Sequence, residues 1–180
     1  AASSEAEILV IQADGKGVPM ILEEATPDKV RLRKGEKHGR KKEAVVTTVY
    51  SIAPVIRTPE QVIASFYDQI HPPKPSKPKN KHLWATLDGK ETALRRLYRQ
   101  VVSRQGSHIQ HKIALCDGCE ALQTRLAKQF PDFTQILDFI HANEYLWAVA
   151  NALLGETNEQ RLEWMKVHSL QLLSGQTKQL

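Results

Sequence analysis

Residues 8–17 read ILVIQADGKG and residues 111–120 read HKIALCDGCE, and these two stretches decide the fold. Each begins with a short, continuous apolar run, which is typical of a strand buried on both faces of a sheet. Each run leads to an Asp-Gly dipeptide, at Asp14 in the first stretch and at Asp117 in the second. If the second strand lies beside the first and parallel to it, both carboxylates emerge at the same edge of the sheet.

Three further segments have strand character. Residues 18–22 (VPMIL) predict a strand that returns from a tight turn at the neighbouring glycines, and residues 44–52 (AVVTTVYSI) are rich in β-branched residues. Residues 133–137 (FTQIL) predict a fifth strand. The first three strands follow one another without a helix between them, which indicates an antiparallel meander.

Helices are expected between and after these strands. Thr58 is a good N-cap, Pro59 suits the first turn, and Gln61 occupies the third position of a capping box. The predicted helices cover residues 58–69, 87–104, 120–130, 140–154 and 158–173. This order predicts an α/β domain with a mixed five-stranded sheet, in which the later strands enter parallel through crossover helices. It is also the order of the ribonuclease H-like fold.

The length and composition limit the class of protein. A chain of 180 residues with 41% apolar and 25% charged residues is enough for one globular domain with a sizeable core. No apolar run approaches the roughly 18 to 20 residues of a membrane span, and residues 1–6 lack the pattern of a signal peptide. We therefore expect an intracellular, cytoplasmic chain with no membrane partner and a disordered tail at residues 1–6.

The positive charge is concentrated in two runs. The chain has 25 Lys and Arg against 20 Asp and Glu, and residues 29–42 (KVRLRKGEKHGRKK) hold eight of these cations and one acid. Residues 74–82 (KPSKPKNKH) form a second, proline-rich run. Either run alone fits a solvated loop equally well, but two of them beside bare carboxylates favour DNA phosphates as the partner. The residues expected to contact DNA are Arg31, Arg33, Lys34, Lys37, Arg40, Lys41 and Lys42.

Asp14 and Asp117 are the candidate metal ligands. Neighbouring strands lie about 4.8 Å apart, and Mg²⁺ binds carboxylate oxygens at about 2.0 to 2.1 Å, so the two groups can share one ion or bridge a pair. Divalent ions held in this way support phosphoryl transfer. The plain alternative is that Asp-Gly after a strand is only a turn.

Four separated segments resemble one family. The segments VIQADGKGVPM, RKKEAVVTTVYSIAP, ALCDGCEALQ and ILDFIHANEYLWAVANALLGE are similar, in this order, to the catalytic core of bacterial insertion-sequence transposases of the ISKra type. The resemblance runs from about Ile8 to about Gln176. These enzymes belong to the transposase superfamily that has an Asp-Asp-Glu (DDE) triad, and they cleave and join DNA at transposon ends.

The resemblance implies a role for four residues. Asp14 and Asp117 match the first and second catalytic acids, which bind Mg²⁺ or Mn²⁺. Asp138 and His141, in LDFIH, match a D/C-x-x-H signature and are expected to support the site. The third acid, a Glu, cannot be placed on any residue of this chain.

The resemblance also implies an organisation of the chain. The ribonuclease H-like catalytic core covers residues 7–157, and residues 158–180 match the start of a helical insertion that is truncated here. An amino-terminal DNA-recognition region of the family has no counterpart. A fragment of this kind is expected to be inactive alone, while its parent would be a nucleoid-associated bacterial enzyme that can form a homo-oligomer.

Three other interpretations stay open. Cys116 and Cys119 form a C-x-x-C motif between a strand and a helix, which is where thiol oxidoreductases carry theirs. Adding His108 and His111 gives four candidate zinc ligands within twelve residues. The third interpretation is a DNA-binding remnant without catalysis, which differs from the transposase hypothesis only in metal binding.

Overall fold

The protein folds around a five-stranded mixed sheet. The computed structural model describes residues 5–20, 41–70 and 74–179. The strands are β1 (Ile8–Pro19), β2 (Lys41–Ile52), β3 (Lys79–Thr86), β4 (His111–Cys116) and β5 (Thr134–Leu137). Their order across the sheet is β3-β2-β1-β4-β5.

The strand directions confirm the predicted α/β class. β2 pairs antiparallel with both β1 and β3, whereas β4 pairs parallel with β1 and β5 pairs parallel with β4. The parallel neighbours are reached through helices, as the crossover rule requires. The condition on which the shared-edge argument rests is met, since the strand before Asp117 lies beside and parallel to the strand that carries Asp14.

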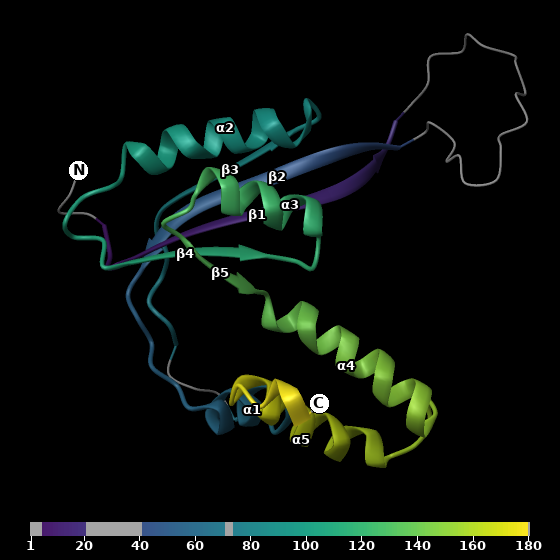
Figure 1. Cartoon of the computed structure of the whole chain (residues 1–180). Coiled ribbons are helices and arrows are strands. Elements are labelled where there is room, and N and C mark those ends of the chain that lie inside the picture. Colours follow the sequence, from purple (N-terminus) through teal and green to yellow (C-terminus); the bar gives the residue numbers. More distant parts are fainter. Residues whose placement is uncertain (1–4, 21–40, 71–73, 180) are drawn as a thin grey trace, which may run out of the picture.

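The helices form two groups. The first comprises α2 (Gly89–Val102) and α3 (Glu120–Gln129), which pack on one face of the sheet. The second comprises α1 (Pro59–Tyr67), α4 (Phe139–Leu154) and α5 (Gln160–Leu173), which lie together beyond β5 (Figure 1). A short 3-10 helix, η2 (Thr177–Gln179), follows α5. Within the described residues, none of the helices is long and apolar enough to cross a membrane.

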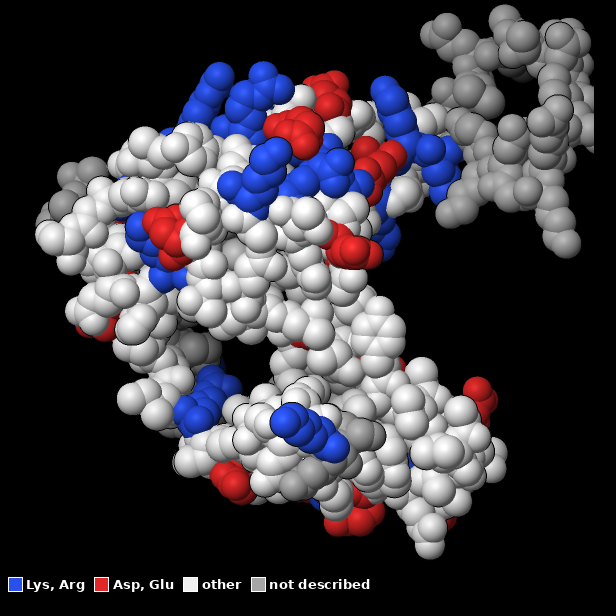
Figure 2. All heavy atoms as spheres, viewed as in Figure 1, with Lys and Arg blue, Asp and Glu red and all other residues white. Residues whose placement is uncertain are grey.

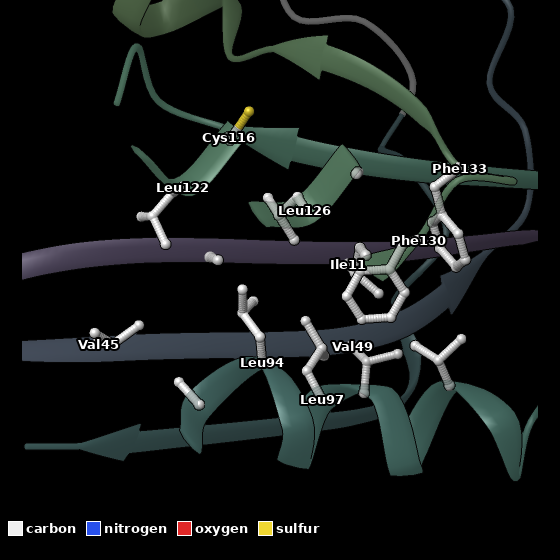
Figure 3. Packing of buried hydrophobic residues seen from close by; sticks show 14 of the residues in the cluster. Ile11, Val45, Val49, Leu94, Leu97, Cys116, Leu122, Leu126, Phe130 and Phe133 are labelled. Carbon is white, nitrogen blue, oxygen red and sulfur yellow. The ribbon is translucent and has the colours of Figure 1, made fainter. Parts of the chain in front are cut away.

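The core fills the space between the sheet and the first helix group. Alternate residues of β1, among them Leu9 and Ile11, are fully buried and point toward α2 and α3. The helices contribute Leu94 and Leu97 from α2 and Leu122 from α3 (Figure 3). Each fully buried Leu or Ile side chain contributes about 1.5–3 kcal/mol, so this packing sets the position of both helices on the sheet.

The predicted turn at residues 14–17 is wrong, and residues 18–19 belong to β1 and not to a returning strand; residues 21–22 of that predicted strand lie outside the described residues. β1 continues without a turn through Asp14 and both glycines, and it stays paired with β2 as far as Pro19 opposite Lys41. Gly15 is extended rather than turning, and a Cβ there would lie 2.7 Å from a carboxylate oxygen of Glu43. The glycine therefore makes room for a side chain of β2, and Pro19 is tolerated because it ends the strand.

The third antiparallel strand is β3, whose first residues lie within the basic run at residues 74–82. That run was interpreted from the sequence as a loop. β3 lies at the edge of the sheet, and most of its residues are exposed. Lysine-rich edge strands are common because their charges prevent association with other chains. The segment KNKHLWAT consequently lacks the apolar alternation by which a half-buried strand is recognised.

The helix predictions are confirmed with small changes at the ends. The side chain of Thr58 accepts a hydrogen bond from the Gln61 N–H at 3.3 Å, and the Gln61 side chain accepts one from the Thr58 N–H at 3.0 Å. This is the capping box expected at the start of α1. The helix predicted at residues 87–104 is α2, which begins two residues later and ends two residues earlier.

Glu5 and Ala6 belong to the fold and not to a disordered tail. The Glu5 carboxylate bonds Arg104, which follows α2, and accepts a hydrogen bond from the Ser51 hydroxyl at 2.5 Å. The Ala6 N–H donates to the same hydroxyl oxygen at 2.9 Å. These contacts attach the chain before β1 to the ends of β2 and α2.

Candidate functional site

Three aspartates each follow one of three residues that are aligned across β1, β4 and β5. Ala13 of β1 is in register with Cys116 of β4, and Cys116 is in register with Leu137 of β5. The next residue along each of the three strands is an aspartate: Asp14, Asp117 and Asp138. Asp14 continues β1, whereas Asp117 and Asp138 lie one residue beyond the ends of β4 and β5, so the three aspartates stand at the same edge of the parallel strands.

The aspartates face away from the main core. Ala13 and Cys116 are buried among the residues that pack against α2 and α3. Successive side chains of a strand point to opposite faces, so the aspartates that follow these residues belong to the other face of the sheet, which α2 and α3 do not cover. We call it the open face. A pocket of about 400 Å³ lies on that face. It is lined by Gln12, Ala13, Asp14, Val46, Thr48, Lys81, Leu83, Leu115, Cys116, Asp117, Asp138 and His141.

The structure therefore brings the four predicted site residues into one pocket. Asp14 lies within β1 and not after it, but β4 ends at Cys116, so β1 has no neighbour on that side from Asp14 onward. The side chain of Asp14 is exposed and has no hydrogen-bond or ion-pair partner among the described residues. Its carboxylate is thus available to a ligand.

The loop after β4 holds Asp117 in a defined position. One carboxylate oxygen of Asp117 accepts a hydrogen bond from the Cys119 N–H at 3.2 Å, and its backbone carbonyl accepts one from the Gln123 side chain at 3.1 Å. Both donors belong to the start of α3. The second carboxylate oxygen has no hydrogen-bond partner in the described part of the chain, so Asp117 combines a fixed orientation with a free ligand atom.

Asp138 caps the helix that carries His141. Its side chain accepts a hydrogen bond from the Ile140 N–H at 2.9 Å, and its own N–H donates to the Cys116 carbonyl oxygen at 3.0 Å. An N-cap aspartate satisfies one of the free N–H groups at a helix start. Asp138 therefore joins β4 to α4 and sets the direction in which α4 leaves the sheet.

His141 lies in the first turn of α4, beside the Asp117 loop. Its Nδ1 lies 3.4 Å from a carboxylate oxygen of Glu144, and its ring meets the Tyr145 ring edge-on at 5.5 Å between centroids. A Cβ on Gly118 would lie 3.2 Å from the Tyr145 hydroxyl oxygen and 3.7 Å from Cδ2 of His141. The absence of a side chain at Gly118 is what allows α4 to approach the loop.

Three polar residues of the pocket were not found from the sequence. Gln12 precedes Asp14 by two residues, so the period of two along a strand is the signal that could have found it. The Thr48 hydroxyl donates to the His82 carbonyl oxygen at 2.8 Å, and Lys81 Nζ lies 6.0 Å from the centre of the Tyr50 ring. Lys81 could be placed only once β3 was known to be a strand.

The predicted DNA contacts lie largely outside the described residues. Arg31, Arg33, Lys34, Lys37 and Arg40 fall in the undescribed segment between β1 and β2. The two remaining candidates, Lys41 and Lys42, begin β2 and are exposed.

The C-x-x-C motif lacks the environment of a redox thiol. Cys116 and Cys119 are both free thiols, and Cys116 is 4% exposed. Burial raises the pKa of the Cys116 thiol, and the neighbouring Asp117 carboxylate raises it further. A reactive cysteine needs a lowered pKa because the thiolate is the nucleophile.

A four-ligand zinc site is equally unsupported. His111 begins β4 and Cys116 ends it, which separates them by about 16 Å at about 3.3 Å per residue. More generally, across residues 5–20, 41–70 and 74–179 no group of three or more His, Cys, Asp or Glu side chains could hold a metal ion. The pocket at Asp14 and Asp117 therefore offers fewer than three protein ligands as it stands.

No family model, curated protein or solved structure matches the chain at a significant level. The function must be argued from the pocket itself.

Proposed function

We propose that the chain is the ribonuclease H-like core of an insertion-sequence DNA transposase of the DDE superfamily. In this proposal Asp14 and Asp117 bind Mg²⁺ or Mn²⁺, and the parent enzyme cleaves and transfers DNA strands. The observation that supports the proposal is the register of β1 and β4, by which Asp14 and Asp117 each follow a paired residue and line one pocket.

Two carboxylates suit magnesium better than they suit zinc. Mg²⁺ prefers oxygen ligands, and it is usually bound by one or two carboxylates while water and substrate phosphates fill its other positions. A pocket with fewer than three protein ligands is compatible with this mode of Mg²⁺ coordination. When bound, the ion would polarise a phosphoryl oxygen and activate an attacking water or 3′-hydroxyl.

The two aspartates would contribute unequally. Asp117 is oriented by the Cys119 N–H, so it would hold the ion in a fixed place. Asp14 is unpaired within the described residues and can adjust to the ion or to an incoming phosphate. Lys81, on another wall of the pocket, supplies a positive charge that would attract the phosphate backbone.

Asp138 and His141 would support the site by fixing the position of α4 relative to the loop that carries Asp117. Asp138 connects β4 to the first turn of α4, and His141 lies against Gly118 in the Asp117 loop. Changes at either residue would shift α4 relative to that loop. The third acid of a DDE triad is not assigned to any residue, so the chain by itself is expected to bind metal and DNA without efficient catalysis.

Contacts to DNA at the transposon ends are proposed for the basic segment before and within β2. Its members are Arg31, Arg33, Lys34, Lys37, Arg40, Lys41 and Lys42. Charge density alone supports this assignment, since Lys and Arg neutralise phosphates and release counterions. Loss of DNA affinity at low salt in an Arg40→Gln/Lys41→Gln variant would support it.

A DNA-binding module without catalysis is the second candidate. The two Lys- and Arg-rich runs support it, because they can bind phosphates without any metal ion. Metal binding separates the two candidates.

Calorimetric titration of Mn²⁺ tests the proposal directly. The wild type should bind the ion, and Asp14→Asn and Asp117→Asn should each abolish binding. Asp132→Asn is the matched control, since Asp132 is an exposed aspartate paired with Lys112 outside the pocket. Equal binding by all four proteins, or none by the wild type, would exclude the proposed site and leave the DNA-binding module.

A further inference from the structure

A second basic surface lies on α2, on the other side of the sheet from the aspartate pocket. We define the α2 basic surface as Arg95, Arg96 and Arg99 of α2 with Lys128 of α3. All four side chains are exposed. Figure 2 shows Lys and Arg side chains gathered over α2, with acidic side chains between them.

Packing fixes the direction of these arginines. The opposite side of α2 is buried through Leu94, Leu97 and Val101, which are 1% exposed or less. With 3.6 residues per turn, this buried stripe forces Arg95 and Arg99 onto the outer side, one turn apart and about 6 Å from each other. Arg96 lies beside them, so the three charges are held on a rigid helix.

The four cations of this surface differ from their neighbours in having no partner. Lys90 is paired with Glu43, and Arg125 is paired with Glu91. By contrast, none of the four side chains makes an ion pair or hydrogen bond with any residue that the structure describes. Adjacent like charges on one helix repel each other, and an anion bound between them would relieve that repulsion.

The surface is open and shallow. Arg95, Arg96 and Arg99 line a hollow of about 210 Å³ together with Thr92. A second hollow of about 340 Å³ between α2 and α3 shares Arg95 and adds Lys128. Arg95 lines both hollows, so the two adjoin, and the one carboxylate in the second hollow, that of Glu91, is paired with Arg125.

We propose that the α2 basic surface binds the phosphate backbone of a duplex DNA segment. Three of its four cations are arginines, whose planar guanidinium forms paired hydrogen bonds with phosphate oxygens. An open surface with charges spaced along a helix fits a repeating phosphate chain rather than one small anion. Contacts to phosphate oxygens carry no sequence information, so this binding should not depend on the base sequence.

This inference goes beyond the proposed metal site. α2 packs on the face that carries Ala13 and Cys116, whereas the aspartates occupy the other face. The duplex on α2 is therefore a different segment from the one whose phosphates would enter the pocket. Binding on α2 needs no metal ion, so the two proposals can fail separately.

The test is the binding of a fluorescein-labelled duplex of about 20 base pairs, measured by fluorescence anisotropy in the presence of EDTA. The salt concentration is varied from about 50 to about 200 mM, the range over which the loss of phosphate contacts changes affinity most clearly. The key variant is Arg95→Gln/Arg96→Gln/Arg99→Gln, which keeps good helix formers on the surface. Each lost phosphate contact removes about 0.9 from the slope of log affinity against log salt. We expect the slope to fall by about 2 to 3 and the affinity at low salt to fall roughly tenfold or more.

Two controls separate local contacts from net charge and misfolding. Lys112→Gln/Lys166→Gln/Lys178→Gln removes the same charge away from α2 and should change the slope by less than about 1. The triple Arg→Lys variant at the α2 positions should keep most of the slope, because the charge is retained. Circular dichroism and Mn²⁺ titration of the Arg→Gln variant should match the wild type.

Three results would overturn the proposal. The first is an unchanged affinity and slope in the Arg→Gln variant. The second is an equal loss in the Lys→Gln control, which would mean that net charge alone acts. The third is a loss of double-stranded RNA binding while DNA binding is retained, which would assign the surface to another polyanion.

Discussion

Substitution of Glu5 by Gln should destabilise the protein strongly, because Glu5 is half of a buried ion pair. Arg104 donates to both Glu5 oxygens, from Nε at 3.0 Å and from Nη2 at 2.7 Å, and its Nη1 donates to the Asn80 carbonyl at 2.9 Å. The Ser51 hydroxyl also donates to Glu5 at 2.5 Å. The side chains of Glu5 and Arg104 are each 7% exposed.

The magnitude follows from the burial. Removing one partner of a buried ion pair leaves an uncompensated charge and costs about 3–5 kcal/mol. Glu5→Gln leaves the Arg104 guanidinium in this state, whereas Glu5→Leu/Arg104→Met removes both charges and should cost far less. An exposed pair is worth less than about 1 kcal/mol, so Glu91→Gln, which breaks the contact with Arg125, is the matched control.

Urea unfolding followed by far-ultraviolet circular dichroism measures these effects. With a slope of about 2 kcal/mol per molar, a loss of about 4 kcal/mol lowers the midpoint by about 2 M. The control should shift by less than about 0.5 M. A shift of under about 0.5 M for Glu5→Gln would refute the claim that the residues before β1 are part of the fold.

The same pair predicts the direction of a pH effect. Burial by itself raises the pKa of Glu5, but hydrogen bonds from Arg104, Ser51 and Asn80, with the charge of Arg104, outweigh it and hold the pKa below its ordinary value of 4.5. A lowered pKa in the folded state means that the stabilisation is fully present above that ordinary value and is lost as the pH falls through the folded value. The stability difference between wild type and Glu5→Gln should therefore shrink below pH 4.5.

Three smaller predictions concern single side chains. A thiol reagent should modify Cys119 and not Cys116 in the folded protein, because Cys116 is buried and its pKa is raised; rapid modification of both would contradict this. Thr58→Ala should cost about 1 kcal/mol through loss of the α1 cap, while Thr58→Ser should cost little in the same urea assay. Asn143→Ala should cost about 2 kcal/mol because its buried amide donates to the Tyr67 hydroxyl at 2.8 Å, and a cost under about 0.5 kcal/mol would show that this hydrogen bond does not stabilise the protein.

The sequence predicts β5 at one edge of the sheet and misses β3 at the other. β4 carries a short, continuous apolar run, and this composition can be recognised without a structure. β3 could not be recognised, since an exposed edge strand is under no pressure to be apolar and its lysines look like a loop. The error at Gly15 has a different cause, because a glycine that makes room for Glu43 looks the same in sequence as one that turns.

The site was predicted in part for the same reason. Asp14 and Asp117 were found because each stands beside a recognisable strand, and the register of β1 and β4 brings them together. Lys81 was missed because its position depends on β3. The contact between Gly118 and Tyr145 also could not be foreseen, since it depends on the direction in which α4 leaves the sheet.

Paramagnetic mapping with Mn²⁺ tests the central claim most directly. In amide proton–nitrogen spectra of the wild type, trace Mn²⁺ should broaden the signals of Asp14, Asp117 and Asp138 and leave that of Arg99, on the far side of the sheet, sharp. Asp117→Asn should abolish the broadening. Broadening centred elsewhere, or none at all, would contradict the assignment of the aspartate row as a metal site.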